Sequence, residues 1–177
     1  MKRRPERMNE KDLASKLEQL HPDSYGWALA CCDHDPDAAR EILQLTYLKI
    51  LAGKARFNGH ASLRTWLYAV IWRTAADQRR RAWLTGARLA RWHASRSEPA
   101  REDPQRSAER AEIGRIVAAA LERLSRRQRE VLHLVFYQGL TIDDAGRVLG
   151  LSPGTARIHY ERGKSRLRNL LPEQVRP

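Results

Sequence analysis

Cysteine is nearly absent from this chain: only two occur among 177 residues, and they are the neighbours Cys31 and Cys32. Adjacent residues of one helix cannot reach the geometry of an ordinary disulfide, so the sequence holds no disulfide framework. Sparse, unbridged cysteine is typical of a reducing compartment, and we expect a cytoplasmic protein. Cys31, Cys32 and His34 together do not have the ligand spacing of a structural zinc site. We therefore expect no metal site and interpret both cysteines as core-facing residues at a helix end.

Long apolar runs are missing as well. No stretch approaches the roughly 20 apolar residues that span a bilayer. The opening residues, MKRRPERMNEKDL, are basic but lack the apolar core of a secretory signal. We therefore expect no membrane insertion. No segment alternates apolar and polar residues at the period of a strand, which predicts an all-α fold.

Catalytic patterns are also lacking. The sequence contains no His, Cys and carboxylate cluster with catalytic or metal spacing and no glycine-rich phosphate loop, so we expect no enzyme and no cofactor. Positive charge, in contrast, is abundant. There are 33 Lys and Arg against 21 Asp and Glu, a net charge of +12, which favours a polyanionic partner such as nucleic acid.

Helical spacing of apolar residues predicts four helices in the N-terminal half. The first follows Asn9 and stops at His21-Pro22, because proline disfavours a helical conformation in the preceding residue. The second covers residues 24–32. The third starts at an Asp35 cap with Pro36 in its first turn. The fourth begins at a Ser62 cap and runs for about four turns.

The two sides of this fourth helix differ. One side is apolar and predicts core packing: Leu63, Trp66, Leu67, Val70, Ile71, Thr74 and Ala75. The other side interleaves aromatic residues with arginines: Arg64, Tyr68, Trp72, Arg73, Arg79, Arg80 and Arg81. Rings stack on unpaired bases and guanidinium groups hold phosphates, so this second side is suited to single-stranded nucleic acid. Trp72 fits either stacking or interhelical packing.

The helical spacing of apolar residues ends after this helix. The segment that follows is rich in Arg, Ser, Ala and Pro, which predicts a linker. We divide the chain into an N-terminal helical domain of residues 1–85, a basic linker of residues 86–110 and a C-terminal domain of residues 111–177. A helix with apolar positions from Ile113 to Leu124 is expected to open the C-terminal domain.

Start and stop signals then predict three more helices. Ser125 and Gln128 form a capping box, and Gly139 supplies a left-handed stop. Thr141 caps a short helix that ends at Gly150. A final basic helix follows a Ser152 cap and runs to about Leu171. A short helix, a glycine turn and a longer basic helix make a helix-turn-helix, whose second helix enters the DNA major groove.

The chemistry of the last helix agrees with contact to duplex DNA. Arginine pairs bidentately with a guanine edge, and isoleucine or a threonine methyl meets a thymine methyl. We expect the early positions to face bases: Thr155, Arg157, Ile158, His159 and Arg162. Lys164, Arg166 and Arg168 lie further along and suit phosphates. An ordinary core helix with a solvated basic face is the alternative interpretation.

Three segments, in this order, resemble parts of the extracytoplasmic-function (ECF) sigma factors of bacterial RNA polymerase. Residues 39–51 are similar to their polymerase-binding helix. The segment FNGHASLRTWLYAVIWRTAADQRRR resembles their promoter-melting region. Residues 121–171 look like their C-terminal DNA-binding domain. The helix-turn-helix alone is shared with many regulators, whereas the melting segment is far more specific.

The resemblance implies a promoter-specificity subunit without catalytic chemistry. Core RNA polymerase would bind Glu41, Gln44, Leu45 and Leu48. The melted minus-ten element would be held by Phe57, Asn58, Ser62, Trp72, Arg73 and Arg80. The minus-thirty-five element would be read as duplex by the helix from Thr155 to Lys164, with Thr141 beside it. The likeness also implies control by an anti-sigma partner.

Three residues depart from the family pattern. Leu45 replaces an acidic residue on the polymerase-facing helix, and Arg73 replaces an asparagine of the minus-ten base pocket. Gly146 replaces a small alanine, and we expect it to cost roughly 1 kcal/mol of helix stability. The competing hypothesis is a helix-turn-helix regulator that binds an operator without engaging polymerase. Such a regulator has no need for the melting segment.

Overall fold

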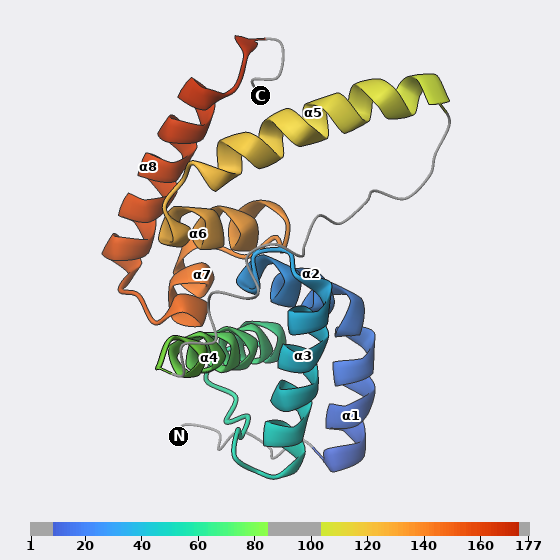
Figure 1. Ribbon diagram of the computed structural model, residues 1–177. Helices are drawn as coiled ribbons and strands as arrows, with labels where there is room; N and C mark the ends of the chain where they lie inside the picture. The colour runs from blue at the N-terminus through green and yellow to red at the C-terminus, as the bar shows by residue number, and fades with distance from the viewer. Residues whose placement is uncertain (1–8, 85–103, 174–177) are drawn as a thin grey trace. The chain divides into compact units, whose positions relative to one another are not determined.

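The computed structural model describes residues 9–84 and 104–173, which contain eight α-helices and no strand (Figure 1). The all-α prediction is therefore confirmed for this part of the chain. The helices are α1 Glu10–Gln19, α2 His21–Cys31, α3 Pro36–Leu51, α4 Leu63–Leu84, α5 Pro104–Glu122, α6 Arg126–Phe136, α7 Ile142–Leu149 and α8 Pro153–Leu170.

The chain divides into two compact units. The N-terminal unit holds α1 to α4. The C-terminal unit holds α5, α6, α8 and the part of α7 up to Gly146, and residues 147–150 are grouped with the N-terminal unit. Most of the expected linker, residues 86–110, lies outside the described residues. Its last part differs from the prediction, because α5 already begins at Pro104. Proline suits a first helical turn, where its missing N–H leaves no bond unmade.

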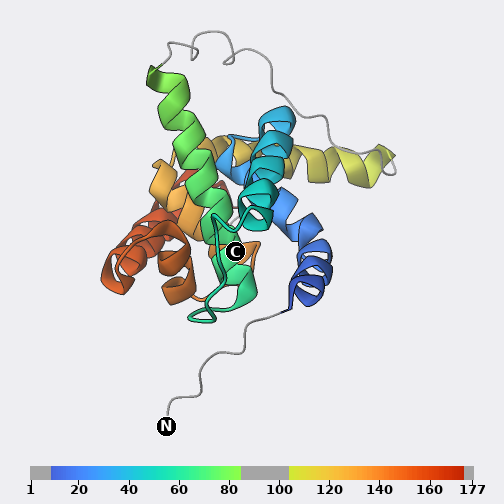
Figure 2. The same cartoon turned by 90° about the horizontal axis from the view of Figure 1, so that it is seen from below.

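The core of the N-terminal unit forms where α2 packs against α3 and α4. Figures 1 and 2 show α4 crossing α3, with α2 beside both. Trp27 of α2 is fully buried, and its indole Nε1 donates to the backbone carbonyl of Tyr68 at 3.1 Å. Leu67 and Ile71 of α4 are also fully buried. Helix α2 thus contributes Trp27, Ala28 and Cys31 to the core, while Tyr25 and Leu29 are half-buried.

A side-chain cap fixes the start of α3, whereas Asn9, the residue expected to cap α1, makes no side-chain cap hydrogen bond. Asp35 Oδ1 accepts hydrogen bonds from the backbone N–H groups of Asp37 and Ala38, both at 3.0 Å, so the predicted cap of α3 is confirmed. The break at His21-Pro22 is shorter than expected. Helix α2 already starts at His21, and Leu20 alone separates it from α1. Pro22 falls in the first turn of α2, where it is tolerated.

The C-terminal unit follows the predicted start and stop signals closely. Both hydrogen bonds of the Ser125–Gln128 capping box are present. Gly139 and Gly150 have positive φ angles of 61° and 65°, which glycine adopts without the penalty that a side chain brings. The buried apolar residues of this part of the chain include Val131, Leu134, Ala145, Val148 and Ala156.

Candidate nucleic-acid interface

The start of α8 is held by its cap. Ser152 Oγ accepts from the backbone N–H of Thr155 at 3.2 Å, and the two hydroxyl oxygens are 2.8 Å apart. Pro153 occupies the first turn. Thr155 is half-buried, and its hydroxyl is engaged with Ser152.

The outward face of α8 is basic. Arg157 and Arg162 are exposed, and Ile158 beside them is 51% exposed. Ala156 and Gly163 are buried on the opposite face. A large exposed isoleucine between two arginines is unusual for a helix that only closes a core. The expectation that these three side chains face outward is therefore met by their exposure.

His159 and Lys164 occupy the margins of this face. His159 is half-buried, and it follows the buried Ala156 by three residues and precedes the buried Gly163 by four. Residues at these spacings share one helix face, so His159 lies toward the inner side of α8. Lys164 is exposed, and its Nζ lies 5.9 Å from the centre of the Tyr160 ring, a cation–π arrangement.

Helix α7 has a reciprocal cap. The Thr141 hydroxyl donates to Asp144 Oδ2 at 2.8 Å and accepts from the Asp144 backbone N–H at 3.1 Å. Asp143 adds a second carboxylate to this first turn. Acidic residues suit a helix N-terminus but repel phosphates. Thr141 caps α7 as predicted, and although the residue is exposed its hydroxyl is already engaged within this cap.

Two glycines let α8 lie close to its neighbours. A Cβ at Gly163 would lie 3.1 Å from Gln128 Cβ and 3.2 Å from Leu132 Cδ1, both on α6. A Cβ at Gly146 would lie 3.1 Å from Ala156 Cβ. These separations are shorter than ordinary van der Waals contact. The expected helix-stability cost of Gly146 stays a prediction, and the structure adds that the glycine permits close packing at the start of α8.

A buried carboxylate organises the start of α6. Glu130 is 4% exposed, and its two oxygens accept from Arg126 Nε at 2.9 Å and Arg127 NH1 at 3.0 Å. A buried charge is costly unless it is paired, and here two guanidinium groups share it. Removing either the acid or both arginines would leave an uncompensated charge at the helix that packs against α8.

The loop before α4 is ordered by its own hydrogen bonds. Asn58 Oδ1 accepts from the backbone N–H of His60 at 3.3 Å, and Gly59 between them has φ of 75°. Ser62 Oγ accepts from Thr65 N at 3.0 Å and caps α4 as predicted. Asn58 and Ser62 are both exposed.

Phe57 packs against α4 within this loop. Its ring meets the Trp66 ring edge to face, with centroids 5.5 Å apart and an interplanar angle of 61°. Both residues are half-buried. The prediction that Trp66 belongs to the core is met only in part, because the residue is half-buried. Phe57 packs against Trp66 and keeps part of its own surface accessible.

The aromatic and arginine side of α4 is smaller than the sequence predicted. Tyr68 is fully buried, so placing it on the exposed face was wrong. Its hydroxyl accepts from Arg64 Nε at 3.1 Å, and Arg64 also pairs with Asp23 at 3.3 Å. Burial raises the pKa of Tyr68 above its ordinary value, while the Arg64 hydrogen bond acts in the opposite direction.

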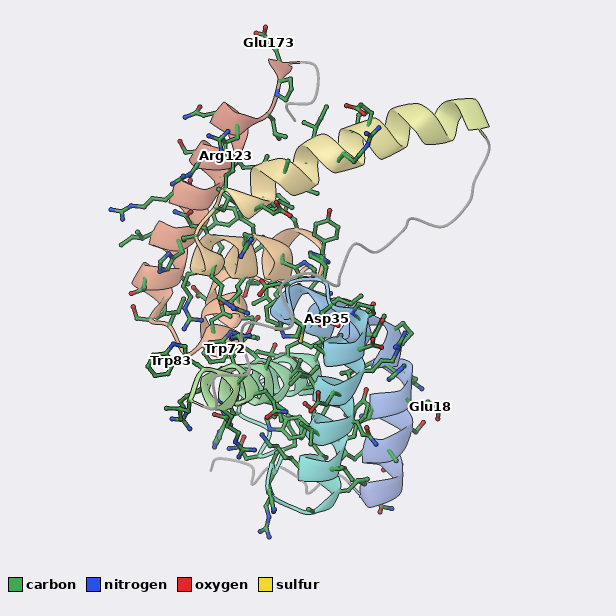
Figure 3. The ribbon with its side chains drawn as sticks, viewed as in Figure 1. Glu18, Asp35, Trp72, Trp83, Arg123 and Glu173 are labelled. Atoms are coloured by element: carbon green, nitrogen blue, oxygen red, sulfur yellow. The ribbon has the colours of Figure 1, made fainter. Side chains whose placement is uncertain are left out.

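Arg79 also has a structural contact, because its NH1 donates to the Cys31 carbonyl at the end of α2 at 2.8 Å. Arg73 and Arg80 are exposed, and Arg80 NH2 lies 3.8 Å from Asp77 Oδ1. Trp72 is half-buried, and Trp83, on the same side of α4, is 65% exposed (Figure 3). The face available to nucleic acid is thus built from Trp72, Arg73, Arg80 and the loop.

Helix α3 presents the residues expected to meet polymerase. Glu41 and Gln44 are exposed, Leu48 is 55% exposed and Leu45 is half-buried. Glu41 Oε1 accepts from Gln78 Nε2 of α4 at 2.9 Å. Leu51, which the sequence reasoning passed over, is 80% exposed. Its helical spacing of three from Leu48 was the available signal.

An exposed aromatic cluster on the C-terminal unit also escaped the sequence reasoning. Phe136 and Tyr137 are 60% and 71% exposed at the end of α6. The Phe136 ring stacks near that of Tyr160 on α8, with centroids 6.0 Å apart, and Tyr137 stacks on His133 at 5.2 Å. Two aromatic residues directly before a helix stop were the signal that could have pointed to this surface.

The cysteines behave as core residues: Cys31 is fully buried and Cys32 half-buried, and both are unbridged. Among residues 9–84 and 104–173, no group of His, Cys, Asp and Glu has the arrangement of a metal site. Across the same described residues, no helix has the length and apolar character needed to cross a bilayer.

Comparison with known proteins accounts for most of the chain. Residues 17–85 match the family Sigma-70 region 2, and residues 114–167 match the family Sigma-70, region 4. An operator-binding regulator would be expected to share only a helix-turn-helix. A match to region 2 upstream of region 4 therefore favours the sigma factor hypothesis over that alternative.

Individual relatives agree with the two domain matches. RNA polymerase sigma factor CarQ of Myxococcus xanthus is 30% identical over 76% of this chain and 75% of its own length. ECF RNA polymerase sigma factor SigC of Mycobacterium tuberculosis is 30% identical over 80% and 74%. The sigma factor RpoE of Bartonella quintana, solved with the anti-sigma factor NepR, has a similar fold, with a TM-score of 0.71 at 24% identity over 90% of this chain and 96% of that one.

On this chain the region 2 match contains α3 and α4, and the region 4 match contains most of α8. Identity of 30% over about three quarters of both proteins is shared with CarQ and with SigC, and SigC is named as an extracytoplasmic-function (ECF) sigma factor. The chain belongs to the extracytoplasmic-function family of RNA polymerase sigma factors.

Proposed function

We propose that the two units of this sigma factor divide promoter recognition between them. Residues 1–85 engage core polymerase and the melted minus-ten element, and residues 111–177 read the minus-thirty-five element as duplex. Residues 86–110, which include the start of α5, connect the two. The order of the matches, residues 17–85 and then 114–167, supports this division. A sigma factor binds core RNA polymerase and promoter DNA and directs initiation, but it catalyses no reaction itself.

The outward face of α8 carries the duplex-reading role. Arg157 and Arg162 supply the bidentate donors that suit a guanine edge, and Ile158 supplies an exposed apolar contact for a thymine methyl. Lys164 lies further along and suits a phosphate. Thr155, His159 and Thr141 lie at the margins of this face, where we propose that they make secondary DNA contacts.

The loop before α4 and the exposed side of α4 bind the separated strand. Phe57 has a fixed ring that a base can approach, and Asn58 and Ser62 offer polar groups on the same loop. Arg73 and Arg80 add exposed positive charge along α4, with Trp72 beside them. Aromatic stacking combined with guanidinium groups holds unpaired nucleotides without requiring a duplex.

Core polymerase docks on α3. Glu41 and Gln44 are exposed polar residues on this helix, and Leu48 is an exposed apolar residue, a combination typical of the core and rim of a protein interface. Leu45 is half-buried and contributes at its edge. The apolar side chain of Leu45 adds to the exposed apolar patch formed by Leu48 and Leu51.

An anti-sigma factor is the second protein partner that we propose. Two solved sigma factors of similar fold were captured in complexes, RpoE with the anti-sigma factor NepR and CnrH with the cytosolic domain of CnrY. This chain exposes apolar side chains on both units, including Leu51 and Tyr137, which a partner could cover. The protein acts in the cytoplasm, where its polymerase and promoters are found.

Run-off transcription tests the function directly. The purified chain is added to bacterial core polymerase on a library of genomic fragments, and the transcripts are sequenced. We expect discrete start sites that share two upstream elements and that depend on the added chain. Specific binding to duplex sites without any start sites, and without association with core polymerase, would contradict the proposal.

A further inference from the structure

Trp66 and Arg73 lie on one side of α4, and the loop that holds Phe57 packs against Trp66. Trp66 and Arg73 are seven residues apart, which is about two helical turns, so they lie on the same side of α4 and roughly 10 Å apart. Phe57 rests against Trp66 with ring centroids 5.5 Å apart. A strand whose base meets Phe57 therefore passes toward Arg73 if it follows the helix.

Arg73 differs from the other described arginines of α4 in having its guanidinium group available. Arg64 is engaged by Tyr68 and Asp23, Arg79 donates to the Cys31 carbonyl, and Arg80 lies near Asp77. Arg73 is exposed and has no hydrogen bond or ion pair with any residue that the structure describes. All its donors are thus available to a ligand.

A guanidinium group recognises two kinds of group on a melted strand. It pairs with any phosphate, which carries no sequence information. It also pairs bidentately with the O6 and N7 acceptors of guanine, which no other base presents together. In an unstacked strand this edge is open to approach.

We propose that Arg73 is a specificity-determining residue that selects guanine in the melted minus-ten strand, near the base held at Phe57. The inference rests on the proposed role of the loop and extends it to one base identity. Lysine at this position keeps the charge but lacks the planar fork, so it separates base recognition from phosphate binding.

The test is a selection with holoenzyme made from the full chain and core polymerase. The probe is a pool of promoter fork DNA whose single-stranded minus-ten segment is randomised. The native chain, Arg73→Lys and Arg73→Ala are compared, and Arg115→Ala serves as control. Arg115 is an exposed arginine in the other unit, so its loss lowers the net charge by the same amount.

We expect the native chain and Arg115→Ala to enrich guanine at one position by roughly tenfold, and both Arg73 variants to lose that enrichment while keeping the preference at the Phe57 position. An unchanged base pattern in Arg73→Lys, with affinity lost only in Arg73→Ala, would make Arg73 a phosphate contact and overturn the inference. Failure of the native chain to select any sequence at all would instead overturn the proposed function, and this inference with it.

Discussion

Gly163 and Gly114 are both interior helix glycines of the C-terminal unit, yet the same substitution should affect them in opposite directions. Alanine is favoured over glycine in a helix interior by about 1 kcal/mol. At Gly114 on α5, an added Cβ meets nothing within 4 Å, so Gly114→Ala should show that whole gain. At Gly163 on α8, the same Cβ would lie 3.1 Å from Gln128 Cβ and 3.2 Å from Leu132 Cδ1.

The contact at Gly163 is difficult to relieve. Leu132 can shift its side chain, but Gln128 Cβ is fixed to the backbone of α6, so the two helices must separate. Overpacking of this kind costs about 1–3 kcal/mol. After subtracting the helix-propensity gain, we expect Gly163→Ala to lower the free energy of unfolding by about 1 kcal/mol. The two variants should therefore differ by about 2 kcal/mol.

Urea and thermal unfolding of the full chain, followed by circular dichroism, would measure this difference. Both glycines lie in the same unit, so the same unfolding transition reports on both. For a domain of this size, 1 kcal/mol shifts Tm by about 4–8 °C. Duplex promoter binding should also weaken in Gly163→Ala, because α8 moves relative to α6. If Gly163→Ala were as stabilising as Gly114→Ala, the close approach of α8 to α6 would be wrong.

Four further substitutions test the proposed contacts. Arg157→Ala should weaken binding to duplex promoter by about 1–3 kcal/mol and relax specificity at one base pair; an equal loss on every sequence would identify a phosphate contact instead. Phe57→Ala should spare duplex binding but reduce permanganate reactivity at the minus-ten element, and a normal bubble would refute its role. Leu48→Asp should lower affinity for core polymerase in a pull-down while leaving the unfolding curve unchanged, because Leu48 is 55% exposed; a fall in stability would point to a core role. Ser125→Ala should cost about 1 kcal/mol by breaking the capping box, as measured in urea; an unchanged midpoint would contradict the importance of that cap.

Helix boundaries in this protein follow from signals that act over three or four residues. Asp35, Ser62, Ser125 and Ser152 each accept a hydrogen bond from a backbone N–H two or three positions later, and each was predicted as a cap. Such contacts depend on local geometry alone. Pro104 was not recognised as a helix start, because no apolar repeat lies close behind it to distinguish a first turn from a linker.

The exposed side of α4 could not be predicted in the same way. The sequence showed a row of arginines and aromatics, but it did not show which of them find partners within the fold. Arg64 and Arg79 are engaged by Asp23 and the Cys31 carbonyl on α2, a helix that precedes them by more than thirty residues. Long-range packing engages Arg64 and Arg79 and leaves Arg73 without a partner among the described residues, a difference that helical periodicity alone does not show.

The sequence by itself determined the class of helices, their caps, the helix-turn-helix and, through its likeness to known sigma factors, the function. Only the tertiary structure decided the burial of Tyr68, the close packing that requires Gly146 and Gly163, and the exposed aromatic pair Phe136 and Tyr137. The physical reason is the distance along the chain over which each kind of contact acts. A cap involves neighbours in the chain, whereas burial and helix approach depend on which distant side chains fill the same space.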